Sequence, residues 1–207
     1  MSSQHLENIF LPGPAGRLQA LYKAGEAGHP GVVLCHPHPQ YGGTMRNKVV
    51  YWMGRAFERM GCSVLRFNFR GVEQSEGVWD NGDGEADDAA AALEWLHARA
   101  AGAPLWVAGF SFGSLAGLKA AHADKRVERM FAVAPAVNLW SFDFLDHEER
   151  PVTVVSGTAD EIVPFDDVRN WCEGHPSVRL HTIDGAGHFF PAHMDQMMAA
   201  LVSDVNL

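Results

Sequence analysis

A serine between two glycines, in the stretch GFSFG at 109–113, has the residue types and spacing of an activated nucleophile. The stretch follows the apolar run 104–110 and opens a helical pattern that starts at Ser111, so the chain must turn sharply at this serine. Glycines leave room for such a turn, and the turn holds the hydroxyl in a strained, exposed position. The predicted chemistry is attack on an acyl carbonyl, with the N–H groups at the start of the helix facing the developing oxyanion.

A serine hydroxyl needs a base to take its proton and a third group to orient that base. Downstream, Asp160 follows the apolar run 151–157, and His188 lies on a glycine-rich stretch after the run 178–183. Both positions are at the carboxyl ends of predicted strands, where parallel sheets form their sites. Serine, then acid, then histidine is a known chain order for such a triad. We therefore predict Ser111 as nucleophile, His188 as general base and Asp160 as orienting acid.

Other titratable residues compete for these roles. Asp184 is the alternative acid, although it shares one short loop with His188, and the side chain of Glu161 is expected to point elsewhere. The remaining candidates are expected at structural positions. Asp166 and Asp167 should begin a helix, His181 should lie inside a strand, and His193 should open the last helix.

The oxyanion also needs backbone donors, one from the residue after the nucleophile and one from the loop after the first strong parallel strand. The first donor is the N–H of Phe112. In the loop at 35–43, Pro37 and Pro39 cannot donate because proline has no N–H. We choose the backbone N–H of His38; the alternatives are Gln40 and Tyr41.

The same loop admits a second interpretation, a metal site at His36 and His38. Alternate residues of an extended segment point in opposite directions, and no third ligand follows nearby. The sequence also lacks the H-E-x-x-H pattern. We predict no metal and no cofactor, and expect His36 to hydrogen-bond the loop backbone.

The elements that must position these residues alternate between strands and helices, which predicts an α/β fold with a mostly parallel sheet and helices on both faces. The runs GVVLC and PVTVV are continuously apolar, as in strands covered on both sides. Acidic Glu85, Asp87 and Asp88 are expected in the first turn of a helix, where the dipole favours them. The expected strands are 31–36, 62–69, 104–110, 127–135, 151–157 and 178–183, with an antiparallel edge hairpin in 5–24 that turns at 12–16; the expected helices are 47–60, 84–101, one from Ser111, 165–173 and 193–205.

Composition fits one globular domain over residues 1–207, with 47% hydrophobic and 20% charged residues. The formal net charge of -9 disfavours nucleic acid and anionic lipid as partners. We find no apolar run long enough to span a bilayer and no secretory signal. The cysteines Cys35, Cys62 and Cys172 have no short spacing and fit reduced thiols, so we expect a cytoplasmic protein.

Six stretches occur together in the order typical of one family: HPHPQYGGTMRNKVV, RFNFRGVEQSEG, GDGEADD, GFSFG, GTADEIVP and GAGHFF. Over nearly its whole length the chain resembles the α/β-hydrolase superfamily, and most closely the small, cap-less bacterial serine hydrolases related to dienelactone hydrolases. The resemblance implies hydrolysis of a small carboxylic ester through an acyl-enzyme, without a cofactor. Dienelactone hydrolases have cysteine where this chain has Ser111, which favours a general esterase.

Larger relatives insert a lid after the strand that here ends near Pro135, but only 136–150 precede the next strand. We therefore predict no large lid and an open pocket.

Arg70 is expected to be structural. A thioesterase, a peptidase or a non-catalytic binding protein with the same fold remain alternatives. Because the base must be neutral, activity should fall below about pH 6.5. Aromatic candidates for the pocket lining are Phe110, Phe112, Trp140, Phe142, Phe144 and Phe189.

Overall fold

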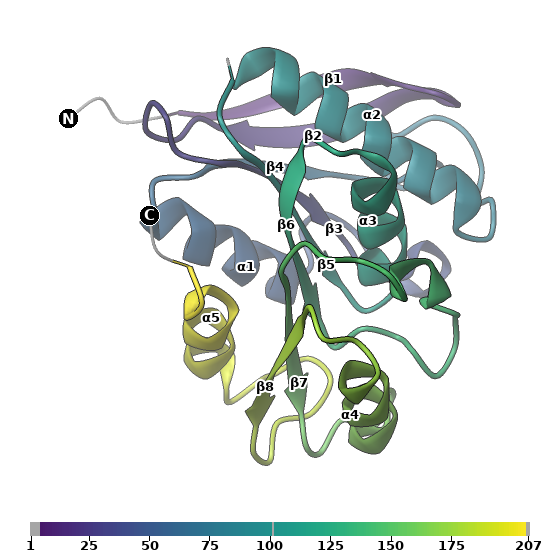
Figure 1. Cartoon of the computed structure of the whole chain (residues 1–207). Coiled ribbons are helices and arrows are strands. Elements are labelled where there is room, and N and C mark those ends of the chain that lie inside the picture. The colour runs from purple at the N-terminus through teal and green to yellow at the C-terminus, as the bar shows by residue number, and fades with distance from the viewer. Residues whose placement is uncertain (1–4, 101, 206–207) are drawn as a thin grey trace.

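The computed structural model describes residues 5–100 and 102–205, and a twisted sheet runs through the centre of this part of the chain (Figure 1). Its eight strands lie in the order β1-β2-β4-β3-β5-β6-β7-β8. Strands β3 to β8 are parallel to one another, and the hairpin β1–β2 joins the edge antiparallel to β4. The predicted α/β fold with a mostly parallel sheet is confirmed. The strands are β1 Leu6–Gly13, β2 Gly16–Lys23, β3 Gly31–Cys35, β4 Ser63–Phe67, β5 Leu105–Phe110, β6 Val127–Val133, β7 Val152–Gly157 and β8 Val178–Ile183.

Helices cover both faces of the sheet, which explains the continuously apolar strands. Figure 1 shows α1 and α5 on one face and α2, α3 and α4 on the other. Successive residues of β3 enter two different cores: Val33 packs with α2 and α3, whereas Val32 and Leu34 pack with α1 and α5. The helices are α1 Lys48–Arg59, α2 Asp83–Arg99, α3 Phe112–Ala123, α4 Phe165–Glu173 and α5 Met194–Val202.

Several predicted boundaries require correction. The strand expected over 62–69 spans Ser63–Phe67, the strand expected over 127–135 ends at Val133, and the helix expected from Ser111 begins at Phe112. The helix expected over 84–101 spans Asp83–Arg99, and Ala101 lies outside the described residues. The helix expected over 193–205 ends at Val202. The bounds of α4 and β8 are those predicted.

The acidic residues at the start of α2 do not share one role. Asp83 and Glu85 lie in its first turn, where Glu85 accepts hydrogen bonds from the backbone N–H groups of Asp80 and Gly82. Asp88 lies one turn further, fully buried, and accepts two side-chain hydrogen bonds from Arg70, at 2.9 and 3.0 Å. The expectation that Asp87 and Asp88 lie in the first turn is wrong, and Asp88 instead forms a buried ion pair. The structural role expected for Arg70 is confirmed.

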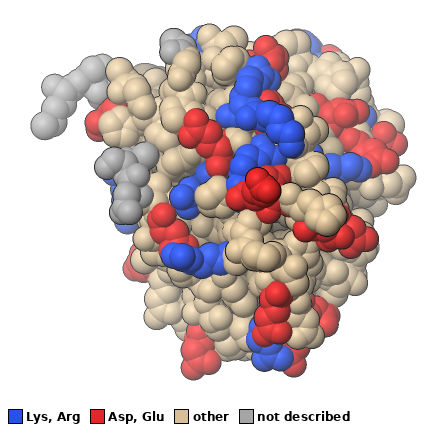
Figure 2. Space-filling view, viewed as in Figure 1, with Lys and Arg blue, Asp and Glu red and all other residues tan. Residues whose placement is uncertain are grey.

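No inserted domain separates β6 from β7 in the described structure. The connection contains only a short 3-10 turn, Asp143–Leu145. Among the described residues, no helix is both long and apolar enough to cross a bilayer. On the face shown in Figure 2, basic side chains lie next to acidic ones. The absence of a nucleic-acid partner stays a prediction.

Candidate active site

Ser111 occupies the sharp turn from β5 into α3. Its φ of 54° and ψ of −122° are a strained combination for a residue with a side chain. The Ser111 N–H donates to the carbonyl oxygen of Val133 at 2.9 Å, which anchors the turn to β6. A β-carbon at Gly113 would lie 2.3 Å from the carbonyl oxygen of Cys35, so the helix can approach β3 only with glycine there.

His188 and Asp160 meet at the same edge of the sheet, after β8 and β7 respectively. His188 Nδ1 lies 2.8 Å from Asp160 Oδ2, and their side chains are 3% and 0% exposed. Asp160 Oδ1 accepts the N–H groups of Ile162 and Val163, each at 2.8 Å. With three hydrogen bonds, the carboxylate is fixed in place. The carboxylate accepts a hydrogen bond from Nδ1–H, which favours the tautomer of the neutral ring that carries its proton on Nδ1. In that tautomer Nε2 is an acceptor.

Glu161 has a position that the sequence did not predict. Its Oε2 accepts a hydrogen bond from the backbone N–H of His188 at 3.1 Å, whereas Asp160 accepts one from the ring. The same oxygen lies 2.7 Å from where a β-carbon at Gly187 would be. Two consecutive acidic residues therefore hold His188: Asp160 contacts the imidazole ring of His188, and Glu161 contacts the backbone N–H of His188.

The competing residues lie elsewhere. Asp184 accepts a hydrogen bond from the Thr158 hydroxyl at 3.1 Å and is exposed. His181 pairs with Asp204 at 2.6 Å. His193 precedes the first residue of α5, and Asp166 and Asp167 lie in the first turn of α4.

The loop after β3 is folded back on itself around His38. The carbonyl oxygen of His38 accepts the N–H groups of Tyr41 and Gly43, at 3.1 and 3.0 Å. The N–H of Gln40 donates to the His38 ring. Two of the three candidate donors, Gln40 and Tyr41, are thus engaged, whereas the N–H groups of His38 and Phe112 make no hydrogen bond within the described residues.

His36 has the structural role expected for it. Its Nε2 accepts the N–H of Phe69 at 3.1 Å, and its Nδ1 lies 2.6 Å from the carbonyl oxygen of Pro37. Burial lowers the pKa of His36 to about 4, so the ring is neutral near pH 7. With both ring nitrogens engaged by the backbone, His36 offers no lone pair to a metal; the described residues contain no cluster of three metal-ligating side chains.

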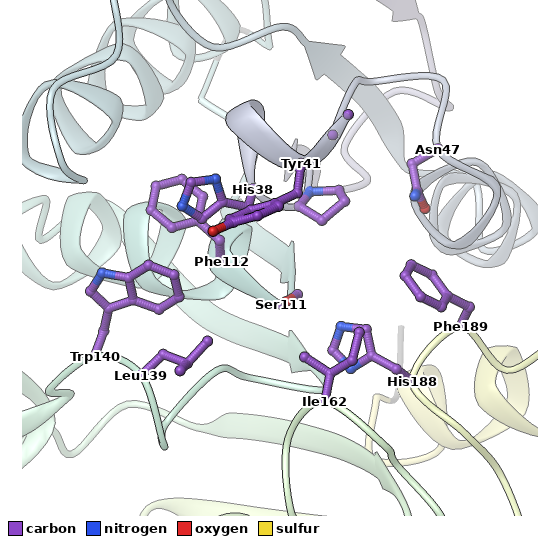
Figure 3. Close-up of a pocket in the computed structure, with 13 residues that line it drawn as sticks. His38, Tyr41, Asn47, Ser111, Phe112, Leu139, Trp140, Ile162, His188 and Phe189 are labelled. Carbon is purple, nitrogen blue, oxygen red and sulfur yellow. The ribbon is translucent and has the colours of Figure 1, made fainter.

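Ser111 and His188 line one cavity of about 340 Å³ (Figure 3). Among the described residues, the Ser111 hydroxyl makes no hydrogen bond to the His188 ring; such a contact is often long until substrate binds. None of the lining residues carries a permanent charge. The lining consists of Pro37, His38, Tyr41, Gly42, Gly43, Asn47, Ser111, Phe112, Leu139, Trp140, Ile162, His188 and Phe189.

The predicted aromatic lining is only partly found. Phe112, Trp140 and Phe189 line the cavity, but Phe110 and Phe142 do not. Phe110 is buried in the core on the α1 and α5 side, and its ring centroid lies 5.0 Å from that of His188. Phe142 turns into the core on the α3 and α4 side and stacks on Phe144, which also lies outside the cavity lining.

Comparison with known proteins agrees with the fold. Residues 30–150 match the family described as the alpha/beta hydrolase fold, and the chain belongs to that family. The protein RP471 of Rickettsia prowazekii (strain Madrid E) is 35% identical, with 95% of this chain and 87% of that protein covered.

Two of the similar solved structures are described as serine hydrolases or homologues of them. An alpha-beta serine hydrolase homologue from Coxiella burnetii superposes with a TM-score of 0.91 at 36% identity, covering 97% of each chain. XC6422 of Xanthomonas campestris, a serine hydrolase without a lid, gives a TM-score of 0.88 at 34% identity, covering 98% of this chain and 94% of that one. The chain thus has an α/β-hydrolase fold whose relatives include lidless serine hydrolases.

Proposed function

We propose that this protein is a serine hydrolase that cleaves small carboxylic esters through an acyl-enzyme. The observation that carries the proposal is the shared cavity of Ser111, strained on its turn, and His188, whose Nδ1 is held 2.8 Å from the buried carboxylate of Asp160. The serine hydrolases among its relatives, at 34% and 36% identity, support the same class.

In the acylation step, Ser111 Oγ attacks the ester carbonyl carbon while its proton passes to Nε2 of His188. Asp160 stabilises the imidazolium that results. The carbon–oxygen bond to the alcohol then breaks, and the same proton moves from Nε2 to the departing oxygen. The acyl group stays on Ser111, and the alcohol leaves.

In the deacylation step, His188 takes a proton from water as the water oxygen attacks the acyl carbon. The bond to Ser111 Oγ breaks, the proton returns from Nε2 to Oγ, and a carboxylic acid is released. In both steps the oxyanion accepts hydrogen bonds from the backbone N–H groups of His38 and Phe112. These two groups have no other partner within the described residues. Such a donor contributes about 10²–10³ in turnover.

Thioesters and amides react by the same steps, so the lining of the cavity must separate these substrates. The cavity has no lysine or arginine side chain. A coenzyme A thioester carries phosphates that proteins often bind with arginine or lysine, so a lining without either favours a neutral ester over such a thioester. Three free, buried cysteines fit the cytoplasm as its location.

The test is labelling of the folded protein with a fluorophosphonate probe, followed by intact mass and peptide mapping. We expect a single adduct on Ser111, hydrolysis of p-nitrophenyl butyrate, and loss of both in Ser111→Ala, with turnover lower by about 10⁴–10⁶. Folded protein that neither labels nor hydrolyses the ester would reject the proposal in favour of a binding protein.

A further inference from the structure

One side of the cavity is an aromatic surface, here called the aromatic wall and formed by His38, Trp140 and Tyr41 together with the fully buried ring of Phe112, which supports His38 and Trp140. The ring centroids of His38, Phe112 and Trp140 lie 5.0, 5.4 and 5.5 Å apart, so each ring touches the other two. Tyr41, which is 86% exposed, packs on His38 at 4.7 Å and forms the outer end of the wall.

The aromatic wall and the imidazole of His188 lie on opposite sides of Ser111. Figure 3 shows His38, Phe112 and Trp140 on one side of the serine, with His188 and Phe189 on the other. The alcohol oxygen of the substrate must lie beside Nε2 of His188 to receive its proton. The alcohol therefore extends past Phe189, and the acyl group extends along the aromatic wall.

The aromatic wall carries no charge. Burial lowers the pKa of His38 below its ordinary range, so its ring is neutral at pH 7. No Asp, Glu, Lys or Arg lines the cavity. A carboxylate placed against this wall would lose its hydration without gaining a partner, whereas a flat ring gains face and edge contacts.

We propose that the acyl-binding side of this cavity selects an uncharged aromatic acyl group, with Trp140 as the specificity-determining residue. This inference rests on the proposed ester hydrolysis. The alcohol side is open: Phe189 is 47% exposed, so the enzyme discriminates little between small alcohols.

Two matched methyl esters test the inference. Methyl 3-phenylpropanoate and methyl 3-cyclohexylpropanoate have the same carbon skeleton, and two methylene groups insulate the carbonyl from the ring. Because the saturated ring is the more hydrophobic, simple burial would favour the cyclohexyl ester. Aromatic contacts instead predict that kcat/KM for the phenyl ester is about five- to tenfold higher.

A charged pair of substrates tests the neutrality of the wall. Monomethyl glutarate carries a carboxylate at the end of an acyl chain as long as that of methyl pentanoate. Desolvating that carboxylate without a partner should lower kcat/KM by about a hundredfold or more. Equal rates for the two esters would contradict the inference.

Three variants locate the selectivity. Trp140→Leu keeps an apolar side chain but removes the ring, so the ratio of phenyl to cyclohexyl rates should fall to about one or below. Trp140→Phe keeps an aromatic ring and should retain most of the preference for the phenyl ester over the cyclohexyl ester. Phe189→Leu, on the alcohol side, should change both rates by the same factor and keep the ratio. Circular dichroism confirms that each variant is folded.

The outcomes separate this inference from the proposed function. A protein that labels with fluorophosphonate and hydrolyses methyl esters, but prefers the cyclohexyl ester, overturns the aromatic acyl group and leaves ester hydrolysis intact. An unchanged ratio in Trp140→Leu overturns the role of Trp140. A folded protein without labelling or turnover overturns ester hydrolysis, and the inference with it.

Discussion

Acid should destabilise this protein in part through one fully buried imidazole, that of His36. The ring accepts the N–H of Phe69 at Nε2, so protonation at that nitrogen would replace a hydrogen bond with a clash of two donors. It would also place a charge in a fully buried site. Burial is the main reason that the pKa of His36 is lowered from 6.5 to about 4, and the carbonyl of Pro37 opposes this only in part.

The size of the effect follows from linkage. Between pH 6.5 and 4 the unfolded chain binds a proton at His36 that the folded protein does not, so the free energy of unfolding falls as the pH falls. The contribution is fully present above pH 6.5. A difference of about 2.5 units corresponds to about 3 kcal/mol lost below pH 4, of which about 2 kcal/mol is already lost at pH 5.

Urea unfolding of the wild type and of His36→Gln at pH 7.5 and pH 5 measures this contribution. Glutamine can accept the N–H of Phe69 but does not titrate. The wild type should be the more stable at pH 7.5, and its advantage should shrink by about 2 kcal/mol at pH 5. Glu85, whose pKa is raised by burial, changes stability in the opposite direction, but it is common to both proteins and cancels. An advantage that stays constant within about 0.5 kcal/mol would refute the assignment to His36.

Other substitutions test the site itself. Asp160→Asn should lower kcat by about 10⁴, because the amide no longer selects the Nδ1–H tautomer of His188, while the melting temperature stays near that of the wild type; steady-state kinetics with a thermal melt checks this. Glu161→Ala removes the acceptor for the His188 N–H and should lower kcat about tenfold with little change in KM, and Glu161→Gln should restore most of it; a change in KM alone would argue against a positioning role. Gly113→Ala places a β-carbon 2.3 Å from the carbonyl oxygen of Cys35 and should prevent folding or lower the melting temperature by several degrees; an unchanged melt would show that the turn can relax.

The sequence predicted the elements and the three residues at the sheet edge for one physical reason. Parallel strands covered on both faces are continuously apolar, so their ends stand out against the polar loops that follow. Once β5, β7 and β8 are placed, Ser111, Asp160 and His188 all follow carboxyl ends of strands and must share one edge.

What the sequence missed depends on side-chain direction within loops and on contacts between distant segments. Phe110 and Phe112 are only two residues apart, yet Phe110 ends a strand and packs in one core, whereas Phe112 begins a helix, packs in the other core and lines the cavity. Hydrophobicity cannot separate the two. Asp88 looked like a helix-dipole residue because its partner, Arg70, lies beyond the loop that precedes the helix. Glu161 gave no signal, because its contact is with a backbone N–H.

The connection between β6 and β7 is too short to form a lid, but it controls the same space by another route. It supplies Leu139 and Trp140 to the cavity wall. Its Asn138 side chain donates to the carbonyl oxygen of Ile162 at 3.2 Å, and Ile162 itself donates its N–H to Asp160. The β6–β7 connection, which supplies Trp140 to the aromatic wall, is therefore linked through two hydrogen bonds to the carboxylate of Asp160, which contacts His188. A substitution that displaces this connection should therefore alter both the proposed acyl selectivity and the position of His188.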